Sequence, residues 1–260
     1  GADGFIGWHI RAHARAHHPN IEVTLATRAT FADAALLQQF VASCDAIIHC
    51  AGVNRGTDAE VGEGNVKLAQ QLADACRAVK TPPHIVFTNS THKATESVYG
   101  VSKRKAAAIL ADAAPLTDMV LSHVFGEFGK PFYNSAVSTF CHQLAASETP
   151  EIIKDGVLEL LHVQEVAARC FAAIHAKQIG EIRMEGRAVR VSELLTKLRV
   201  MKAQYTEQHL IPQLADPLEL ALFNTLRSYR YPANAVVPLT LKSDSRGHLF
   251  EAVRTLHGGQ

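Results

Sequence analysis

Tyr99 and Lys103 lie four residues apart at the start of a helical pattern, a spacing that places both side chains on one face of a helix. A nearby ammonium favours the ionised phenol, which would prepare Tyr99 to exchange a proton with a substrate oxygen. Ser90 ends an apolar run earlier in the chain and could hydrogen-bond the same oxygen. Taken alone, Tyr99 and Lys103 would be an ordinary solvated pair, so the catalytic interpretation depends on the elements around them.

A glycine-rich turn opens the sequence, with Gly1, Gly4 and Gly7 spaced three apart and Phe5 and Ile6 between them. A turn that leads from a strand into a helix needs glycine where the backbone approaches a pyrophosphate and where helix and sheet touch. The helix N-terminus then offers free N–H groups and a positive dipole to that anion. The turn therefore predicts a dinucleotide site, although a glycine turn without a ligand is a comparable alternative.

The elements that would position these residues alternate between strand and helix. Apolar runs predict strands at 21–25, 46–50, 84–88 and 118–121, with helical patterns at 5–17, 65–79 and 99–113. Such alternation predicts βαβ units and a parallel sheet, whose strand carboxyl ends and following loops share one ligand-binding edge. The glycine turn, the strand before Ala51 and Gly52, the strand before Ser90, and then Tyr99 and Lys103 occur in the order that this arrangement requires. That order favours the catalytic interpretation.

The regular alternation of strand and helix ends at about residue 125. Beyond it, helices are predicted at 134–146 and 163–177 and a short strand at 159–162. Ser192 could cap a helix that runs to Val200, and Asp216 followed by Pro217 predicts the start of another. We therefore predict an α/β fold: a Rossmann-like, doubly wound parallel sheet with a smaller interleaved C-terminal substrate lobe. The predicted boundaries are 1–125 and 158–178 for the dinucleotide domain, whose first strand is missing from the chain, and 126–157 and 179–245 for the lobe.

Composition and charge exclude several classes of protein. Lys and Arg number 26 against 25 Asp and Glu, a balance that gives no sign of nucleic-acid binding. The longest apolar stretch, 46–53, is too short to span a membrane. Five cysteines without a C-x-x-C pair favour free thiols in a reducing compartment, so we expect a cytoplasmic protein. His9, His13 and His17 recur on the first predicted helix without a nearby cysteine or carboxylate at ligand spacing, so we expect a solvated face and no metal.

The chain resembles the extended short-chain dehydrogenase/reductase family, also called the NAD-dependent epimerase/dehydratase family. The resemblance rests on the turn at 1–7, the strand at 45–52, the asparagine of Asn65-Val66 at a helix start, the trio of Ser90, Tyr99 and Lys103, and the run 155–166. It implies a doubly wound fold in which the trio is catalytic. The cofactor contacts that follow from the resemblance and the turn are Gly1, Gly4, Phe5, Ile6, Gly7, Cys50, Ala51, Gly52, Lys103 and His123. The family usually has asparagine where this chain has His123, and a serine pair where it has Thr88 and Asn89.

A narrower resemblance is to the bifunctional capsular-polysaccharide enzymes of UDP-N-acetyl-L-fucosamine biosynthesis, carried by 51–55, 130–135, 139–141 and 243–251. In those enzymes a reductase domain uses NADPH to reduce the C4 ketone of a UDP-linked 6-deoxy sugar, and a zinc cupin domain epimerises C3. The resemblance implies NADP(H), a UDP-sugar substrate, a homodimer, and residues 246–260 as the start of a cupin that is otherwise absent. The substrate contacts it implies are Asn54, Arg55, Thr91 and Asn134, although Asn134 could simply cap a helix.

The predicted strand at 21–25 would be the second strand of the dinucleotide fold, counting the missing first strand. Its end bears on the choice of cofactor. An acidic residue there binds both ribose hydroxyls of NAD, whereas an arginine accommodates the 2′-phosphate of NADP. The segment ends at Thr27 and Arg28, with no carboxylate before Asp33, so Arg28 is predicted to contact that phosphate. A solvated loop arginine is the alternative.

Two other functions stay open from the sequence. An NAD-dependent nucleotide-sugar epimerase or dehydratase would share the fold and the trio. A dehydratase commonly has an acidic residue after its serine or threonine, whereas Thr91, His92 and Lys93 follow Ser90 here. A non-catalytic dinucleotide sensor would have no need for the intact trio.

Overall fold

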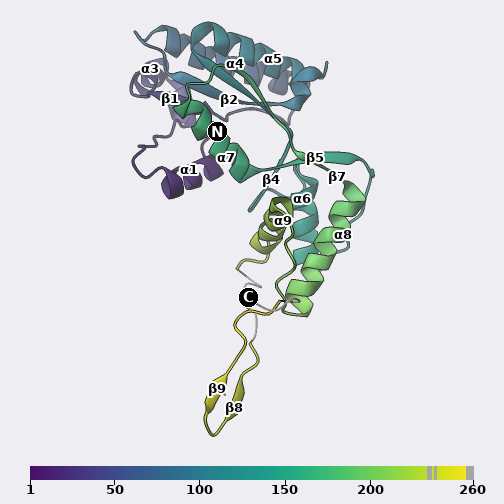
Figure 1. The fold of residues 1–260 in the computed structure, drawn as a ribbon. Coiled ribbons are helices and arrows are strands. Elements are labelled where there is room, and N and C mark those ends of the chain that lie inside the picture. Colours follow the sequence, from purple (N-terminus) through teal and green to yellow (C-terminus); the bar gives the residue numbers. More distant parts are fainter. Residues whose placement is uncertain (233–235, 237–238, 256–260) are drawn as a thin grey trace. The chain divides into compact units, whose positions relative to one another are not determined.

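The computed structural model describes residues 1–232, 236 and 239–255. Two compact units make up the chain (Figure 1). The first consists of residues 1–122 and 163–186, and the second of residues 123–162 and 187–260. The chain thus leaves the first unit after residue 122 and returns to it at residue 163, so the two units are interleaved in sequence.

A parallel sheet forms the centre of the first unit, with the strand order β1-β2-β3-β6. Its strands are β1 (Ala46–His49), β2 (His84–Ser90), β3 (Leu116–Leu121) and β6 (Gly180–Met184). β2 and β3 are almost wholly buried, as expected of strands covered on both faces. The predicted parallel α/β class is confirmed.

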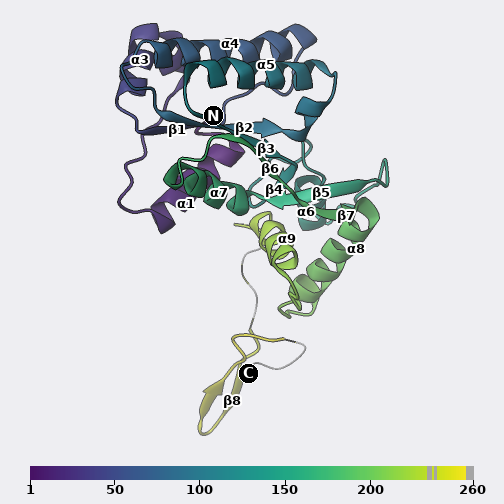
Figure 2. The same cartoon turned by 45° about the horizontal axis from the view of Figure 1, so that its top comes forward.

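Helices cover both faces of this sheet (Figure 2). On one face α4 (Asp58–Arg77) packs along α5 (Val98–Ala113), and on the other α1 (Phe5–His17) packs along α7 (Val163–His175). The shorter helices of this unit are α2 (Arg28–Ala32), α3 (Ala34–Ala42) and the 3₁₀ turn η1 (Thr91–Ala94). Ile85 and Phe87 of β2 pack with Leu72 of α4 and Leu110 of α5 in the core beneath the first pair.

Two predicted elements of the first unit differ in the structure. The segment at 21–25 forms no strand: it has no ladder partner among the described residues, and Ile21, Val23 and Leu25 are 38%, 44% and 38% exposed. Periodicity alone is insufficient there, because a strand requires a hydrogen-bonding neighbour. β6 pairs with β3, with Asp118 opposite Glu181, although the predicted lobe included residues from 179 onward. The charged residues along β6 are those of an edge strand.

Helix α4 begins at Asp58, earlier than the predicted start at 65. Thr57 and Glu60 form a capping box: Thr57 Oγ1 accepts from the Glu60 N–H at 3.3 Å, and Glu60 Oε2 accepts from the Thr57 N–H at 2.7 Å. Asn65 is therefore in the second turn of the helix, not at its start. Helix α5 is capped by Ser97, whose hydroxyl accepts from the Gly100 N–H at 3.1 Å.

The second unit contains a three-stranded sheet, in which β5 (Val157–His162) pairs in parallel with β4 (His123–Phe125) and antiparallel with β7 (Arg187–Arg190). Its other elements are α6 (Ala136–Ala145), α8 (Val191–Lys202), the π-helical turn η2 (Ala203–Glu207), α9 (Pro217–Ser228), and the hairpin of β8 (Lys242–Asp244) and β9 (Gly247–Leu249). A core of Phe, Leu and Val side chains from the sheet and from α6, α8 and α9 holds the unit together. The predicted cupin start at 246–260 falls partly outside the described residues.

Capping in this unit follows prediction at α9 and not at α8. Asp216 caps α9, accepting from the Glu219 N–H at 3.0 Å, as its position before Pro217 predicted. Ser192 lies inside α8, which starts at Val191, and its hydroxyl donates to Asp155 at 2.9 Å. At α6 the helix cap is Ser135, the residue after Asn134.

Candidate functional site

The glycine turn is fitted closely against the end of β1. A Cβ on Gly1 would lie 2.3 Å from the carbonyl carbon of Cys50, and one on Gly7 would lie 2.2 Å from the oxygen of Gly1. Both positions therefore exclude a side chain. A Cβ on Gly4 would meet only the Gly1 oxygen, at 3.3 Å, so the space in front of Gly4 is open.

The start of α1 suits a diphosphate group. Gly4 is the N-cap and supplies no side-chain hydrogen bond, and the first turn, which includes Phe5 and Ile6, contains no acidic residue. The first N–H groups of a helix have no intrahelical partner and carry its positive end. Together with the open space at Gly4, these features fit the diphosphate of a dinucleotide. A cavity of about 770 Å³ adjoins the turn, lined also by residues 20–26 and β1.

The histidines of α1 form no metal site. His9 is buried, and its Nδ1 accepts from the Gln164 amide at 2.9 Å. The His13 ring lies 4.5 Å from that of His17 and 5.7 Å from that of Phe171, in a packed aromatic group on α1 and α7. No group of three or more His, Cys, Asp or Glu within the described part of the chain is placed to hold a metal.

Neutral side chains occupy the carboxyl end of β1. His49 stacks between Phe31 and Phe87, with ring centroids 6.2 and 5.6 Å away, and burial lowers its pKa to about 3. Burial raises the pKa of the Cys50 thiol to about 11. Neither group is charged near pH 7, so the wall beside the glycine turn is uncharged and Cys50 is not a reactive thiolate.

Asn65 fixes the loop that follows β1. This buried residue accepts from the Val53 N–H at 2.9 Å and donates to the Val53 oxygen at 2.7 Å and to the Ser102 hydroxyl at 3.0 Å. The loop is thereby tied to α4 and α5. It includes Ala51 and Gly52, and a Cβ on Gly52 would lie 3.1 Å from the Asn65 oxygen. The one signal in the sequence was the family resemblance of Asn65-Val66, which placed Asn65 at the start of a helix.

The candidate substrate residues Asn54 and Arg55 lie on the same loop and are exposed. Thr91, another candidate, is the first residue of η1. Arg28 is exposed at the start of α2, which Thr27 caps by accepting from the Thr30 N–H at 3.3 Å. Asn54, Arg55 and Arg28 are thus open to solvent, as residues that meet a ligand need to be, whereas Thr91 is partly buried.

The trio gathers where β2 ends and α5 begins. Lys103 is 3% exposed, and its Nζ donates to the Thr88 oxygen at 2.8 Å and lies 3.8 Å above the Phe87 ring. Burial lowers the pKa of Lys103 to about 7, while the negative charge of Asp118 opposes that shift. Two residues after Thr88, the Ser90 hydroxyl accepts from the backbone N–H of the second residue of η1 at 3.2 Å.

Tyr99 is on the first turn of α5, on the helix face that it shares with Lys103. Its ring meets the His92 ring edge-on at 6.1 Å. A Cβ on Gly100 would lie 2.2 Å from the His92 oxygen, so glycine at this position lets η1 pack against the helix. The turn after Ser90 and the turn that carries Tyr99 are thereby held side by side.

Two predicted site residues belong to the second unit. His123 begins β4 and is exposed. Asn134 is exposed and precedes α6, but Ser135 caps that helix, accepting from the Ser138 N–H at 3.2 Å. The alternative role of Asn134 as a helix cap is therefore wrong.

Comparisons with known proteins agree with this architecture. UDP-2-acetamido-2,6-beta-L-arabino-hexul-4-ose reductase of Pseudomonas aeruginosa is 28% identical over all of this chain and 72% of its own length. The capsular polysaccharide assembling protein CapF of Staphylococcus aureus matches all of this chain and 72% of its own, with a TM-score of 0.76 and 22% identity. WbmF of Bordetella bronchiseptica, solved with NAD+ and UDP, has a TM-score of 0.69 and 13% identity over 87% of this chain and 89% of its own.

None of the helices in the described residues is both long and apolar enough to cross a bilayer.

The model of the NAD dependent epimerase/dehydratase family matches residues 1–184, which include the glycine turn, the loop after β1 and the trio. That match spans well over half of the sequence. The chain belongs to the NAD-dependent epimerase/dehydratase family.

Proposed function

We propose that this protein uses NADPH to reduce the C4 ketone of a UDP-linked 4-keto-6-deoxy N-acetyl sugar, in the synthesis of precursors for capsular or O-antigen polysaccharide. The observation that carries the proposal is the junction of β2 and α5, which gathers Ser90, Tyr99 and the buried Lys103. The Pseudomonas relative, named as a reductase of a UDP-linked keto sugar, supports the choice of reaction.

Each of the three side chains has a separate role in the reduction of the ketone. When bound, the reduced nicotinamide supplies the hydride that adds to the ketone carbon. Tyr99 donates the proton that makes the ketone oxygen a hydroxyl, and the Ser90 hydroxyl hydrogen-bonds that oxygen and orients it. The Lys103 ammonium has three N–H donors. One donates to the Thr88 oxygen, so two are left for the phenol and the cofactor ribose.

The cofactor preference rests on Arg28. Its guanidinium is exposed at the first residue of α2, and no carboxylate lies between Glu22 and Asp33 to repel a 2′-phosphate. Arginine can bind a phosphate through two charge-assisted hydrogen bonds. These features support NADPH over NADH.

A direct test measures NADPH oxidation with a panel of 4-keto UDP- and dTDP-sugars, and Tyr99→Phe provides the inactive control. We expect turnover with UDP-linked 4-keto sugars and a strong preference for NADPH. A purified protein that retains NAD and interconverts sugars without net oxidation would instead be an epimerase. Cofactor binding without turnover of any sugar would point to a sensor. Either outcome would overturn the proposal.

We also propose, from the family resemblance, that the protein is a homodimer. The cysteine usage, the charge balance and the short apolar stretches of the sequence support a cytoplasmic protein that binds neither nucleic acid nor membrane. Light scattering of the purified protein gives the mass of the assembly directly. A monomer at micromolar concentration would contradict the dimer.

A further inference from the structure

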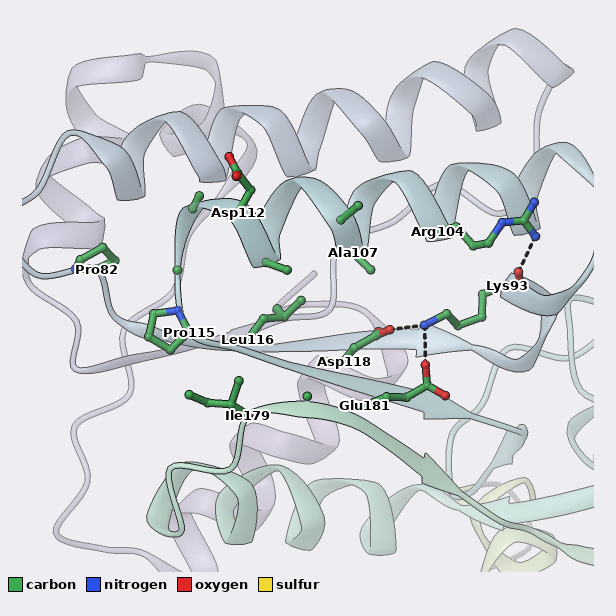
Figure 3. A pocket seen from close by; sticks show the side chains of 15 residues that line it. Pro82, Lys93, Arg104, Ala107, Asp112, Pro115, Leu116, Asp118, Ile179 and Glu181 are labelled. Atoms are coloured by element: carbon green, nitrogen blue, oxygen red, sulfur yellow. Dashed lines mark hydrogen bonds and ion pairs between the residues drawn. The ribbon is translucent and has the colours of Figure 1, made fainter.

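A buried carboxylate interrupts the apolar strand β3. Asp118 is 7% exposed, and a charge in such a position is costly unless it is paired and hydrogen-bonded. Its Oδ1 accepts from the Asn89 amide at 2.7 Å, and its Oδ2 forms an ion pair with Lys93. Figure 3 shows the Lys93 ammonium between Asp118 and Glu181, the second of which lies at 2.9 Å.

This cluster reaches the candidate site through the backbone. The Oδ1 atom of Asn89 accepts from the Ser90 N–H at 2.8 Å, so Asp118, Asn89 and Ser90 form a continuous hydrogen-bonded chain. Three residues after Ser90 in the chain, the Lys93 oxygen accepts from Arg104 of α5 at 2.6 Å, a contact also visible in Figure 3. Hydrogen bonds therefore fix both the residue before Ser90 and the turn η1 that follows it.

We propose that Asp118 is a positioning residue of the site, which fixes the end of β2, and with it Ser90, through Asn89 and Lys93. The proposal rests on the proposed function only for the roles of Ser90 and Lys103 in reduction. The hydrogen-bonded chain itself stands on the contacts above. Asp118 lines a cavity of about 800 Å³ beside α5.

The same carboxylate is near Lys103, the other buried charge of the site: Asp118 pairs with Phe87 in the β2–β3 ladder, and the Lys103 Nζ lies 3.8 Å above the Phe87 ring. Two other groups near Lys103 are uncharged near pH 7, because burial raises the pKa of Cys50 to about 11 and lowers that of His49 to about 3. Asp118 is then the negative charge that favours the ammonium of Lys103. It is partly neutralised by its ion pair with Lys93. Asp118 thus influences two members of the trio, one through hydrogen bonds and one through its field.

The first test does not require a substrate. Lysine is labelled with ¹³C at the ε carbon, the Lys103 signal is assigned from its absence in Lys103→Arg, and its midpoint is followed by NMR titration. We expect Asp118→Asn to lower the Lys103 midpoint by about half a unit or more, because a stabilising negative charge is lost. Glu181→Gln is the matched control: it removes the other carboxylate that binds Lys93 but does not touch Asn89. An unchanged midpoint in Asp118→Asn, or an equal shift in Glu181→Gln, overturns the role of the charge.

The second test addresses Ser90. We expect the Ser90 amide to exchange hydrogen about tenfold faster in Asp118→Leu, which removes the acceptor of Asn89, and to keep its rate in Glu181→Gln. Asn89→Ala gives a second measurement if Asp118→Leu fails to fold. Unchanged exchange at Ser90 in the folded variants refutes the positioning role.

Kinetics separate this inference from the proposed function. With an accepted substrate, Asp118→Asn should lower kcat at least threefold and shift its pH profile to lower pH, with the KM for NADPH within twofold of wild type. If the wild-type protein reduces none of the sugars, the proposed function fails while the NMR and exchange measurements still decide the role of Asp118.

Discussion

His49 should make the stability of the protein depend on pH below neutrality. Its ring is 5% exposed, and burial, reinforced by the charge of Lys103, lowers its pKa to about 3. A histidine in the unfolded chain titrates near pH 6.5. As the pH falls below that value, the unfolded chain binds a proton that the folded protein does not bind, so the free energy of unfolding decreases. The contribution is fully present above about pH 6.5 and is lost progressively as the pH falls towards 3.

The size of the effect follows from the two pKa values. Each pH unit between them is worth about 1.4 kcal/mol, so acidification from pH 7 to pH 5 should cost about 2 kcal/mol through this one group. His49→Phe removes the titration and keeps an aromatic ring between Phe31 and Phe87. His49→Gln offers a second non-titrating variant.

Urea unfolding at pH 7 and pH 5 measures the free energy of unfolding of each protein. The wild type should lose about 2 kcal/mol more than His49→Phe on acidification, because the other histidines are common to both proteins. Equal losses in the two proteins would show that His49 becomes protonated in the folded state and would refute the reasoning.

Three further substitutions test the site. Tyr99→Phe should lower kcat by about 10²–10⁴-fold and leave NADPH binding nearly unchanged; more than about a tenth of the wild-type rate would contradict the role of the phenol. Arg28→Ala should weaken NADPH binding by roughly 10–100-fold, the loss of one charge-assisted bond, and NADH binding should barely change, as fluorescence titration can measure. Asn65→Leu should lower the free energy of unfolding by about 2–4 kcal/mol in urea, because the Val53 N–H and oxygen lose their partner. A loss below about 1 kcal/mol would mean that water replaces the amide.

The parts of the fold that could be predicted from the sequence are those set by local pattern. The apolar runs that became β1, β2 and β3 need no partner to be recognised, and Asp216 before Pro217 marks a helix start by its own chemistry. The segment at 21–25 has an equally good strand pattern, yet it has no strand beside it among the described residues. The opposite holds for β6: its charged residues do not give a strand pattern, yet all of its residues pair with β3. Local pattern therefore predicts which segments can form strands, and pairing decides which of them do.

The candidate site divides in the same way. The types and spacing of Tyr99 and Lys103 indicate a function because both lie on one helix, where spacing fixes the shared face. The buried polar pairs that hold the site together join distant parts of the chain. Asp118 is 29 residues from its partner Asn89, and Ser102 is 37 residues from its partner Asn65. Contacts of this kind depend on sheet register and helix packing, which no spacing rule encodes. Sequence can therefore nominate the groups that perform the chemistry, whereas the buried polar side chains that would hold and tune them emerge only from the fold.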